Sequence, residues 1–281
     1  MDLFKGGLGQ TRYHSMQITH LGSGSKGNAT LISSGENIAL VDSGFSLKQT
    51  EKRLGGIGIE PNSIDAIVVT HHHKDHSNSA LRASKAWDAE LHCNLGTAKR
   101  LGWDPETGCS AFGNLQRVDL GGSLSFVPIP VPHEDSENVA IIASNGKGGR
   151  AAIVTDLGEA PADLLGHLKK CNHISIESNY DHTRLMQGPY PDSLKRRISG
   201  RGGHLSNSQT AGIMRRVIHE KLDSIVLCHL SERNNAPHIA ESEVLMAIEE
   251  AFTGDLSISK QDGPEFTHWT GQSEPTRLAI A

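Results

Sequence analysis

The chain has 281 residues, of which 36% are hydrophobic, and a formal net charge of −5. This apolar content excludes a chain that is disordered throughout, and apolar runs far below the roughly 20 residues needed to cross a bilayer exclude a membrane-spanning helix. The excess of acidic residues excludes a protein that coats nucleic acid by bulk electrostatics alone, so we expect a soluble protein with no membrane partner.

Short β-rich runs dominate the first half of the sequence, separated by glycine, asparagine or proline. In chain order the pattern predicts strands at residues 18–21, 29–32 and 38–41, a helix at 47–54, a strand at 64–69, a helix at 79–87, and strands at 124–129, 139–143 and 151–155. It then predicts a helix at 162–170, a strand at 173–177, a helix at 206–219, a strand at 224–228 and a helix at 238–251, and residues 256–260 fit one edge strand. This mixture predicts an α/β fold with two sheets and helices on their outer faces.

The ends of the chain and its cysteines indicate a simple organisation. We expect residues 1–15 to be a flexible N-terminal extension, residues 16–260 to form one domain, and residues 261–281 to be a polar C-terminal tail. No apolar signal segment lies near the start, so a cytoplasmic location is expected. The cysteines lie far apart without a C-x-x-C pair, which favours reduced thiols: Cys93, Cys109, Cys171 and Cys228.

Positive charge is concentrated in residues 184–216. This segment holds seven basic residues and one acid, Asp192, so its net charge is +6 while the rest of the chain carries −11. The basic residues are Arg184, Lys195, Arg196, Arg197, Arg201, Arg215 and Arg216. A cationic patch on an acidic body suits an anionic substrate docked at one place, and a solvated helix face is the alternative interpretation.

Four histidines fall within six residues that follow the apolar run 65–70. In extended chain, the spacing of His71 and His73 places both imidazoles on one side, where they can bind one metal ion, and we expect His72 to point away. Asp75 and His76 would then turn toward a second ion. A surface histidine tract is the alternative interpretation.

Three further candidate ligands follow other predicted strands. His133 follows the run ending at residue 132, Asp156 follows the strand at 151–155, and His229 follows the strand at 224–228. Alone, either histidine is more often a hydrogen-bonded core residue than a ligand. Together, polar groups at four strand ends predict a cup for two metal ions, and imidazole and carboxylate ligands suit Zn²⁺ and Mn²⁺ alike.

The motif H-x-H-x-D-H at residues 71–76, followed by His133, Asp156 and His229, resembles the metallo-β-lactamase family over roughly residues 17–230. The resemblance implies an αββα sandwich of two mixed β-sheets flanked by helices. It implies two divalent metal ions per chain, the first held by His71, His73 and His133. It implies that Asp75, His76 and His229 hold the second ion, with Asp156 bridging the two, so that a metal-activated water carries out hydrolysis.

Motifs in the second half, and one segment near the start, resemble the YycJ/WalJ-like subgroup of that family. They are G-H-L-S-N at residues 203–207 and H-L-S-x-x-N-N at residues 229–235, together with the glycine-rich segment 22–30 and the segments 155–158, 177–181 and 188–191. The resemblance implies a 5′-to-3′ DNA exonuclease acting on a strand with a free 5′ end. Its expected substrate-binding residues are Ser25, Asn28, Ser206, Asn207 and Asn235, although a plain hairpin turn also explains the glycine-rich segment.

Three residues are expected to carry catalysis. Asp75 would orient the attacking water besides binding metal. Resemblance to RNase Z implies that Glu177 orients His204, which stabilises or protonates the leaving oxygen. The alternative is that His204 has no catalytic role and only contacts backbone at the start of the helix. His204 precedes the helix predicted at 206–219, whose first turn, capped by Ser206 or Asn207, favours an anion.

The sequence also departs from the subgroup, and it leaves other functions open. Tyr180 stands where relatives carry histidine, with His182 two residues further on, so the role of residues 179–182 is open. His229 follows Asp156 by only 73 positions, which leaves no room for a separate β-CASP domain. The rival functions are a glyoxalase-II-like thioesterase or lactonase that uses the same seven ligands, and a metal-dependent module that binds nucleic acid ends without cleaving them.

Overall fold

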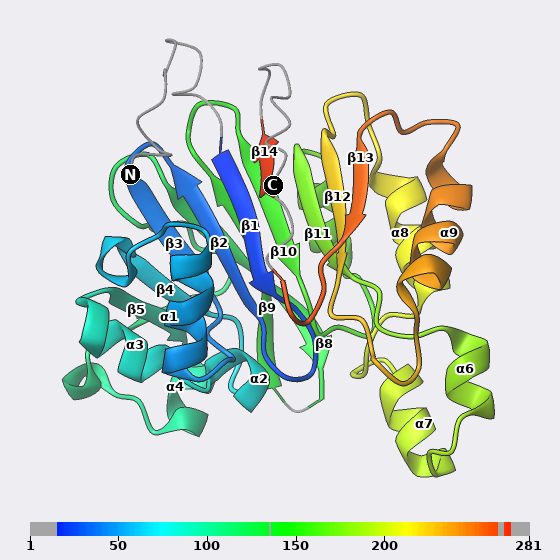
Figure 1. The fold of residues 1–281 in the computed structure, drawn as a ribbon, viewed down its shortest axis with the longest axis horizontal. Helices are drawn as coiled ribbons and strands as arrows, with labels where there is room; N and C mark the ends of the chain where they lie inside the picture. Colours follow the sequence, from blue (N-terminus) through cyan, green and yellow to red (C-terminus); the bar gives the residue numbers. More distant parts are fainter. Residues whose placement is uncertain (1–15, 135, 264–266, 271–281) are drawn as a thin grey trace.

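Two seven-stranded β-sheets pack face to face, and helices cover their outer faces (Figure 1). The computed structural model describes residues 16–134, 136–263 and 267–270. The expected extension at residues 1–15 lies outside the described residues. The predicted αββα sandwich of two mixed sheets is confirmed.

The first sheet has the strand order β14-β1-β2-β3-β4-β5-β6, antiparallel from β14 to β3 and parallel from β3 to β6. Its strands are β1 (Met16–Gly22), β2 (Ala29–Ser34), β3 (Asn37–Val41), β4 (Ala66–Val69), β5 (Glu90–Asn94), β6 (Cys109–Phe112) and β14 (Thr267–Thr270). The helices of this half are α1 (Leu47–Gly56), α2 (Lys74–Ser77), α3 (Ala80–Trp87) and α4 (Leu95–Leu101), with 3-10 turns at Pro61–Ser63 and Pro105–Thr107. The segment expected to be a polar tail therefore contributes one edge strand, β14, which pairs with β1.

The second sheet has the order β13-β12-β11-β10-β9-β8-β7. Its strands are β7 (Val118–Asp119), β8 (Ser125–His133), β9 (Ser136–Ser144), β10 (Arg150–Val154), β11 (His173–Glu177), β12 (Ser224–Cys228) and β13 (Asp255–Ile258). The helices are α5 (Ala162–Leu168), α6 (His182–Gln187), α7 (Asp192–Ser199), α8 (Asn207–Val217) and α9 (Pro237–Ile248). The edge strand expected near residues 256–260 is present as β13, parallel to β12.

The alternation of side chains along each strand divides the core into three layers. All four residues of β4 are buried, with Ile67 and Val69 packing under the helices of the first sheet and Ala66 and Val68 packing between the two sheets. Side chains alternate across a strand, so a strand buried on both faces is apolar throughout. A third cluster, which includes Phe252, packs the second sheet against α5, α8 and α9.

Every predicted strand and helix is present, with bounds shifted by a few residues. The predictions omitted β5, β6, β7 and β14, together with the short helices α2, α4, α6 and α7. All four cysteines are buried free thiols, as expected. Within the described ranges, no helix has the length and apolar content to cross a bilayer.

Candidate metal centre

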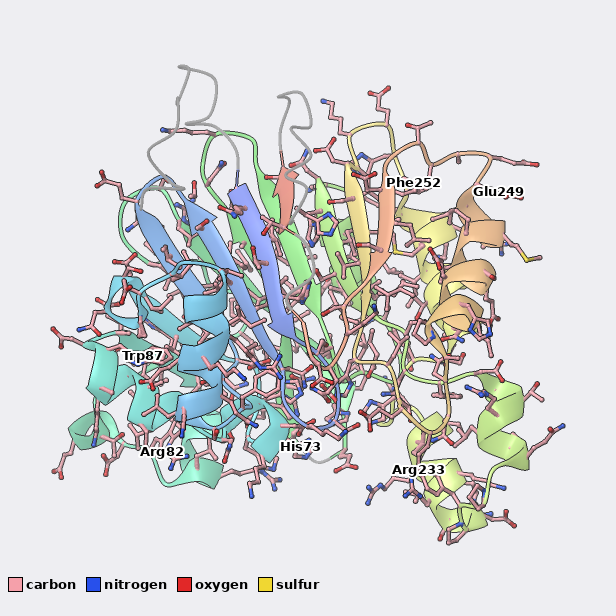
Figure 2. The ribbon with its side chains drawn as sticks, viewed as in Figure 1. His73, Arg82, Trp87, Arg233, Glu249 and Phe252 are labelled. Carbon is pink, nitrogen blue, oxygen red and sulfur yellow. The ribbon has the colours of Figure 1, made fainter. Side chains whose placement is uncertain are left out.

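One edge of the sandwich collects the predicted ligands, because the strands that precede them end there. Strands β10, β11 and β12 are mutually parallel, and β3 is parallel to β4. The carboxyl ends of parallel strands meet at one edge of a sheet, where ligand sites form. His71 follows β4, His133 ends β8, and Asp156 and His229 follow β10 and β12. His73 is visible at this lower edge in Figure 2.

The first group of candidate ligands is His71, His73 and His133. The Nδ1 atom of His73 lies 2.9 Å from Nε2 of His71 and 3.2 Å from Nε2 of His133. Each neutral imidazole carries one proton and one lone pair, so three ring nitrogens facing one another at this range suit a cation bound between them. This is the three-histidine set that sequence reasoning assigned to one ion.

The second group is Asp75, His76 and His229. The Oδ2 atom of Asp75 lies 3.7 Å from Nε2 of His76 and 3.6 Å from Nε2 of His229. The His229 Nε2 atom is buried without a hydrogen-bond partner, which is costly for a polar group unless a ligand satisfies it. In each group the candidate ligand atoms lie within 4.8 Å of one another.

Asp156 faces both groups. One of its carboxylate oxygens lies 2.8 Å from Nε2 of His76, and the other lies 3.7 Å from Nε2 of His133. The side chain is buried, and this burial alone would raise its pKa, but the surrounding histidines lower the pKa well below its usual value. The ionised carboxylate is the form that binds a metal ion, so the donor set fits two divalent ions that share Asp156.

Three of the candidate ligand histidines have a hydrogen-bonding partner on the outward ring nitrogen. His76 Nδ1 lies 2.7 Å from Asp42 Oδ2, His229 Nδ1 lies 2.7 Å from Glu177 Oε1, and His133 Nδ1 lies 3.1 Å from the carbonyl oxygen of Gly203. Such partners set the tautomer and orientation of metal-binding histidines.

Sequence reasoning missed Asp42, although it follows the predicted strand at 38–41 just as the ligands follow their strands. Its Oδ1 atom accepts hydrogen bonds from the backbone N–H of Thr70, at 2.8 Å, and from the Thr70 hydroxyl, at 3.0 Å. Asp42, Asp156 and His229 all have left-handed backbones, with φ of 63°, 58° and 54°. Non-glycine residues rarely adopt this conformation, and such strain concentrates at functional sites.

Glu177 ends β11 and is completely buried. Its Oε1 atom lies 2.8 Å from Nδ1 of His204, and its Oε2 atom accepts hydrogen bonds from the backbone N–H of Leu157 and of Leu205, each at 3.2 Å. Burial alone would lower the pKa of His204, but the Glu177 charge and hydrogen bond, with the Asp156 charge, raise it above its usual value. The His204 side chain keeps 22% exposure, so Nε2 is the ring nitrogen left to face a substrate.

The expected substrate-binding residues divide into two sets. Ser25 is exposed in the loop between β1 and β2, whereas Asn28 is buried, with its amide nitrogen 3.0 Å from Nε2 of His76. Ser206 caps α8 through the backbone N–H of Gln209, confirming the expected cap.

Asn207 and Asn235 lie together beneath the surface. Both are buried, and each side-chain amide donates a hydrogen bond to the other residue's Oδ1 atom, at 3.0 and 2.8 Å. Tyr180 is also buried and forms a β-bridge with Ser206, while His182 begins α6. The structure therefore does not bring these asparagines or Tyr180 to an exposed surface.

The cationic segment is not one patch. Arg215 and Arg216 occupy the last turn of α8, whereas the capped first turn of that helix is next to Glu177. Eleven residues of helix span about 16 Å, so these two arginines lie away from the metal centre. Helices α6 and α7 project beside the centre (Figure 1), and α7 carries Lys195, Arg196 and Arg197 on a helix with no buried residue.

Glu134 lies between α7 and the first group of candidate ligands. Its Oε1 atom lies 3.3 Å from Nε of Arg197, and its Oε2 atom lies 3.6 Å from Nε2 of His73. Arg201 pairs with Glu159 at 2.9 Å. Arg197 and Arg201 are therefore exposed, and Arg197 lies near the candidate ligand His73 through Glu134.

Comparisons with known proteins agree with this geometry. The pattern of the Metallo-beta-lactamase superfamily matches residues 22–194. The chain is 31% identical over 238 residues to Exodeoxyribonuclease YycJ of Bacillus anthracis, covering 84% of this chain and 90% of that protein. It is 27% identical over 238 residues to Exodeoxyribonuclease WalJ of Streptococcus pneumoniae serotype 2, covering 83% and 88% of the two chains.

Among solved structures, the metallo-beta-lactamase fold protein YhfI from Bacillus subtilis superposes with a TM-score of 0.67 at 16% identity, covering 90% of this chain and 99% of that one. At this identity the likeness concerns the fold alone. The family pattern spans more than half of the sequence, and the full-length relatives match with high coverage. The chain therefore belongs to the metallo-β-lactamase superfamily.

Proposed function

We propose that the chain is a dinuclear-metal phosphodiesterase that degrades DNA in the 5′-to-3′ direction from a free 5′ end. The observation that carries this proposal is the convergence of two three-residue ligand groups on a shared carboxylate, Asp156. The exodeoxyribonuclease names of two relatives support DNA as the substrate. The exposed cations of α7 supply the positive charge that a phosphate backbone requires.

In the proposed site, His71, His73 and His133 would hold one ion, and Asp75, His76 and His229 would hold the other, with the Asp156 carboxylate available to both. Zn²⁺ or Mn²⁺ bound there would lower the pKa of a bound water and neutralise charge on the phosphate. The Asp75 carboxylate, still partly accessible with 27% of its side chain exposed, orients the attacking water.

His204 and Glu177 serve the leaving group. Glu177 fixes the ring through Nδ1 and favours its charged form, so Nε2 donates its proton to the oxygen that leaves the phosphorus. Ser25, in the exposed loop beside Asn28, contacts the substrate. Asn28 and Ser206 act through His76 and the first turn of α8, and the buried pair Asn207 and Asn235 holds the nearby loops in position.

A panel of substrates tests the proposal. Linear DNA with a 5′-phosphate, the same sequence as a closed circle, a matching RNA, and a small thioester and lactone are each incubated with the metal-restored protein. We expect hydrolysis of linear DNA and none of the circle, because an exonuclease needs an end. Turnover of the thioester or lactone without DNA hydrolysis would contradict the nuclease function and identify the protein as a thioesterase or lactonase.

A charge-neutralised α7 supplies the matched control. Lys195→Ala combined with Arg196→Ala removes two cations that have no ion pair to Glu134, the half-buried Lys195 and the exposed Arg196. We expect the KM for DNA to rise and to depend less on salt, because fewer counterions are released on binding. The variant Lys48→Ala, which changes an exposed lysine of α1, should behave as wild type. An unchanged KM for DNA in the α7 variant would indicate that these cations do not contact the substrate and form only a solvated surface.

A further inference from the structure

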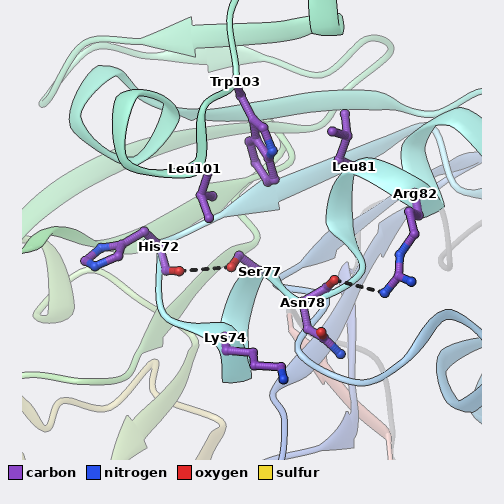
Figure 3. A pocket seen from close by; sticks show the side chains of 8 residues that line it. All are labelled: His72, Lys74, Ser77, Asn78, Leu81, Arg82, Leu101 and Trp103. Carbon is purple, nitrogen blue, oxygen red and sulfur yellow. Dashed lines mark hydrogen bonds between the residues drawn. The ribbon is translucent and has the colours of Figure 1, made fainter.

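A pocket of about 370 Å³ lies beside the metal-binding loop, on the side built by the first sheet and its helices. We call it the Trp103 pocket. It is lined by His72, Lys74, Ser77, Asn78, Leu81, Arg82, Leu101 and Trp103. Figure 3 shows Trp103, Leu101 and Leu81 on one side of the pocket and Ser77, Asn78 and Lys74 on the other, with Arg82 at its edge. The metal-binding function described above uses none of these side chains.

The Trp103 pocket adjoins the metal centre directly. The Ser77 hydroxyl donates hydrogen bonds to the carbonyl oxygens of His72 and His73, both at 3.0 Å, which ties the pocket wall to the ligand loop. The rings of His72 and His73 are 4.7 Å apart between centroids, and Lys74 immediately precedes Asp75. A molecule in this pocket would therefore lie next to the candidate ligands.

The lining combines an apolar surface with positive charge. Leu81 and Trp103 are only partly buried against the core, so they offer apolar surface to a ligand. Lys74 and Arg82 are exposed, and none of the eight lining residues is acidic. His72 adds a buried Nδ1 atom that has no hydrogen-bond partner. An aromatic ring beside cations is the combination by which proteins bind single-stranded nucleic acid, the ring stacking on a base and the cations pairing with phosphate.

We propose that the Trp103 pocket binds a nucleobase of the DNA strand beside the phosphate being cleaved, with the base against the Trp103 indole and a neighbouring phosphate on Lys74 and Arg82. This inference rests on the proposed nuclease function and deepens it. The pocket belongs to the half of the molecule that contains α2 to α4, and the α7 cations belong to the other half (Figure 1). The strand would thus cross the metal centre with protein contacts on both sides.

A binding measurement tests the pocket without relying on catalysis. Deoxyadenosine 5′-monophosphate is titrated into the 281-residue chain while tryptophan fluorescence is recorded. We expect saturable quenching in wild type and its loss in Trp103→Phe, since the other two tryptophans do not line the pocket. Arg82→Ala should weaken binding, whereas Lys85→Ala, an exposed lysine on the same helix outside the pocket, should not. No quenching, or quenching that persists in Trp103→Phe, would overturn the proposal.

A kinetic measurement tests it on the substrate. We expect Trp103→Ala to raise the KM for single-stranded DNA about 5-fold to 100-fold, with kcat and metal content near wild type, and Trp103→Phe to restore most of the loss. Circular dichroism checks that both variants are folded. Wild-type KM in Trp103→Ala would refute the pocket while leaving the nuclease function in place. Nucleotide quenching through Trp103 without any DNA hydrolysis would refute the nuclease function and keep the pocket.

Discussion

Acidification is expected to destabilise the fold through His20, a buried residue of β1 that lies between the sheets. Its Nε2 atom is 2.7 Å from the hydroxyl of Ser175 on β11, and its Nδ1 atom is 2.9 Å from the hydroxyl of Thr30. Burial, followed by the neighbouring His268, lowers the pKa of His20 from 6.5 to about 3. The ring is therefore neutral in the folded protein at pH values where an unfolded chain protonates it.

The direction of the effect follows from proton binding. Between pH 6.5 and 3 the unfolded chain binds the extra proton, so the free energy of unfolding falls as the pH falls. Well above pH 6.5 the ring is neutral in both states and His20 contributes no pH dependence. At 1.36 kcal/mol per pKa unit, the loss from His20 alone is about 1.4 kcal/mol at pH 5.5 and about 2.7 kcal/mol at pH 4.5. His173 is also completely buried, and burial lowers its pKa well below the usual value. Its titration therefore adds to the loss of stability as the pH falls.

Urea unfolding measures this loss. Wild type and His20→Gln are compared at pH 7.5 and 5.5, both without metal, because metal binding has its own pH dependence. The variant is less stable at neutral pH, but its stability should fall by about 1.4 kcal/mol less than that of wild type between the two pH values. Equal losses in the two proteins would refute the argument that His20 is held neutral by burial.

Three further substitutions test the metal centre. Asp42→Ala leaves His76 Nδ1 without its carboxylate, so metal affinity should fall by about 10-fold to 100-fold in a chelator competition; unchanged affinity would remove Asp42 from the support of the centre. His204→Ala should lower kcat by about 100-fold or more with metal content unchanged, and loss of an ion would instead make His204 a ligand. Gly44→Ala would place a Cβ atom 1.7 Å from the Asp75 carbonyl oxygen. The resulting strain of about 1–3 kcal/mol should lower the melting temperature by several degrees. An unchanged melting temperature would contradict the close approach of Gly44 to Asp75.

The strands, and the candidate ligands that follow them, could be predicted because each has a local signature. An apolar run followed within two residues by a histidine or aspartate marks β4, β10 and β12 in the sequence, and the structure brings the residues after these strands together. The missed elements have no such signature. Helix α7 buries no residue and so has no apolar stripe, while β5 includes His92 and Asn94, which are buried despite being polar.

Pairings between distant residues could not be predicted from spacing. The contact of Asp42 with His76, the sharing of Glu177 between His204 and His229, and the mutual hydrogen bonds of Asn207 and Asn235 all depend on how the sheets and loops meet. The sequence likewise places Arg215 and Arg216 within the same charged segment as α7, although the length of α8 separates them from the centre.

The most direct test of the central claim is the digestion of 5′-labelled, 5′-phosphorylated DNA by wild type and Asp75→Ala, after chelation and with Zn²⁺ or Mn²⁺ restored. Metal analysis of both proteins accompanies it, and circular dichroism confirms that the variant is folded. The account predicts that wild type, only with metal, releases labelled mononucleotides from the first time point, while Asp75→Ala releases none. Labelled fragments of many lengths, or equal release by the folded Asp75→Ala variant, would contradict it.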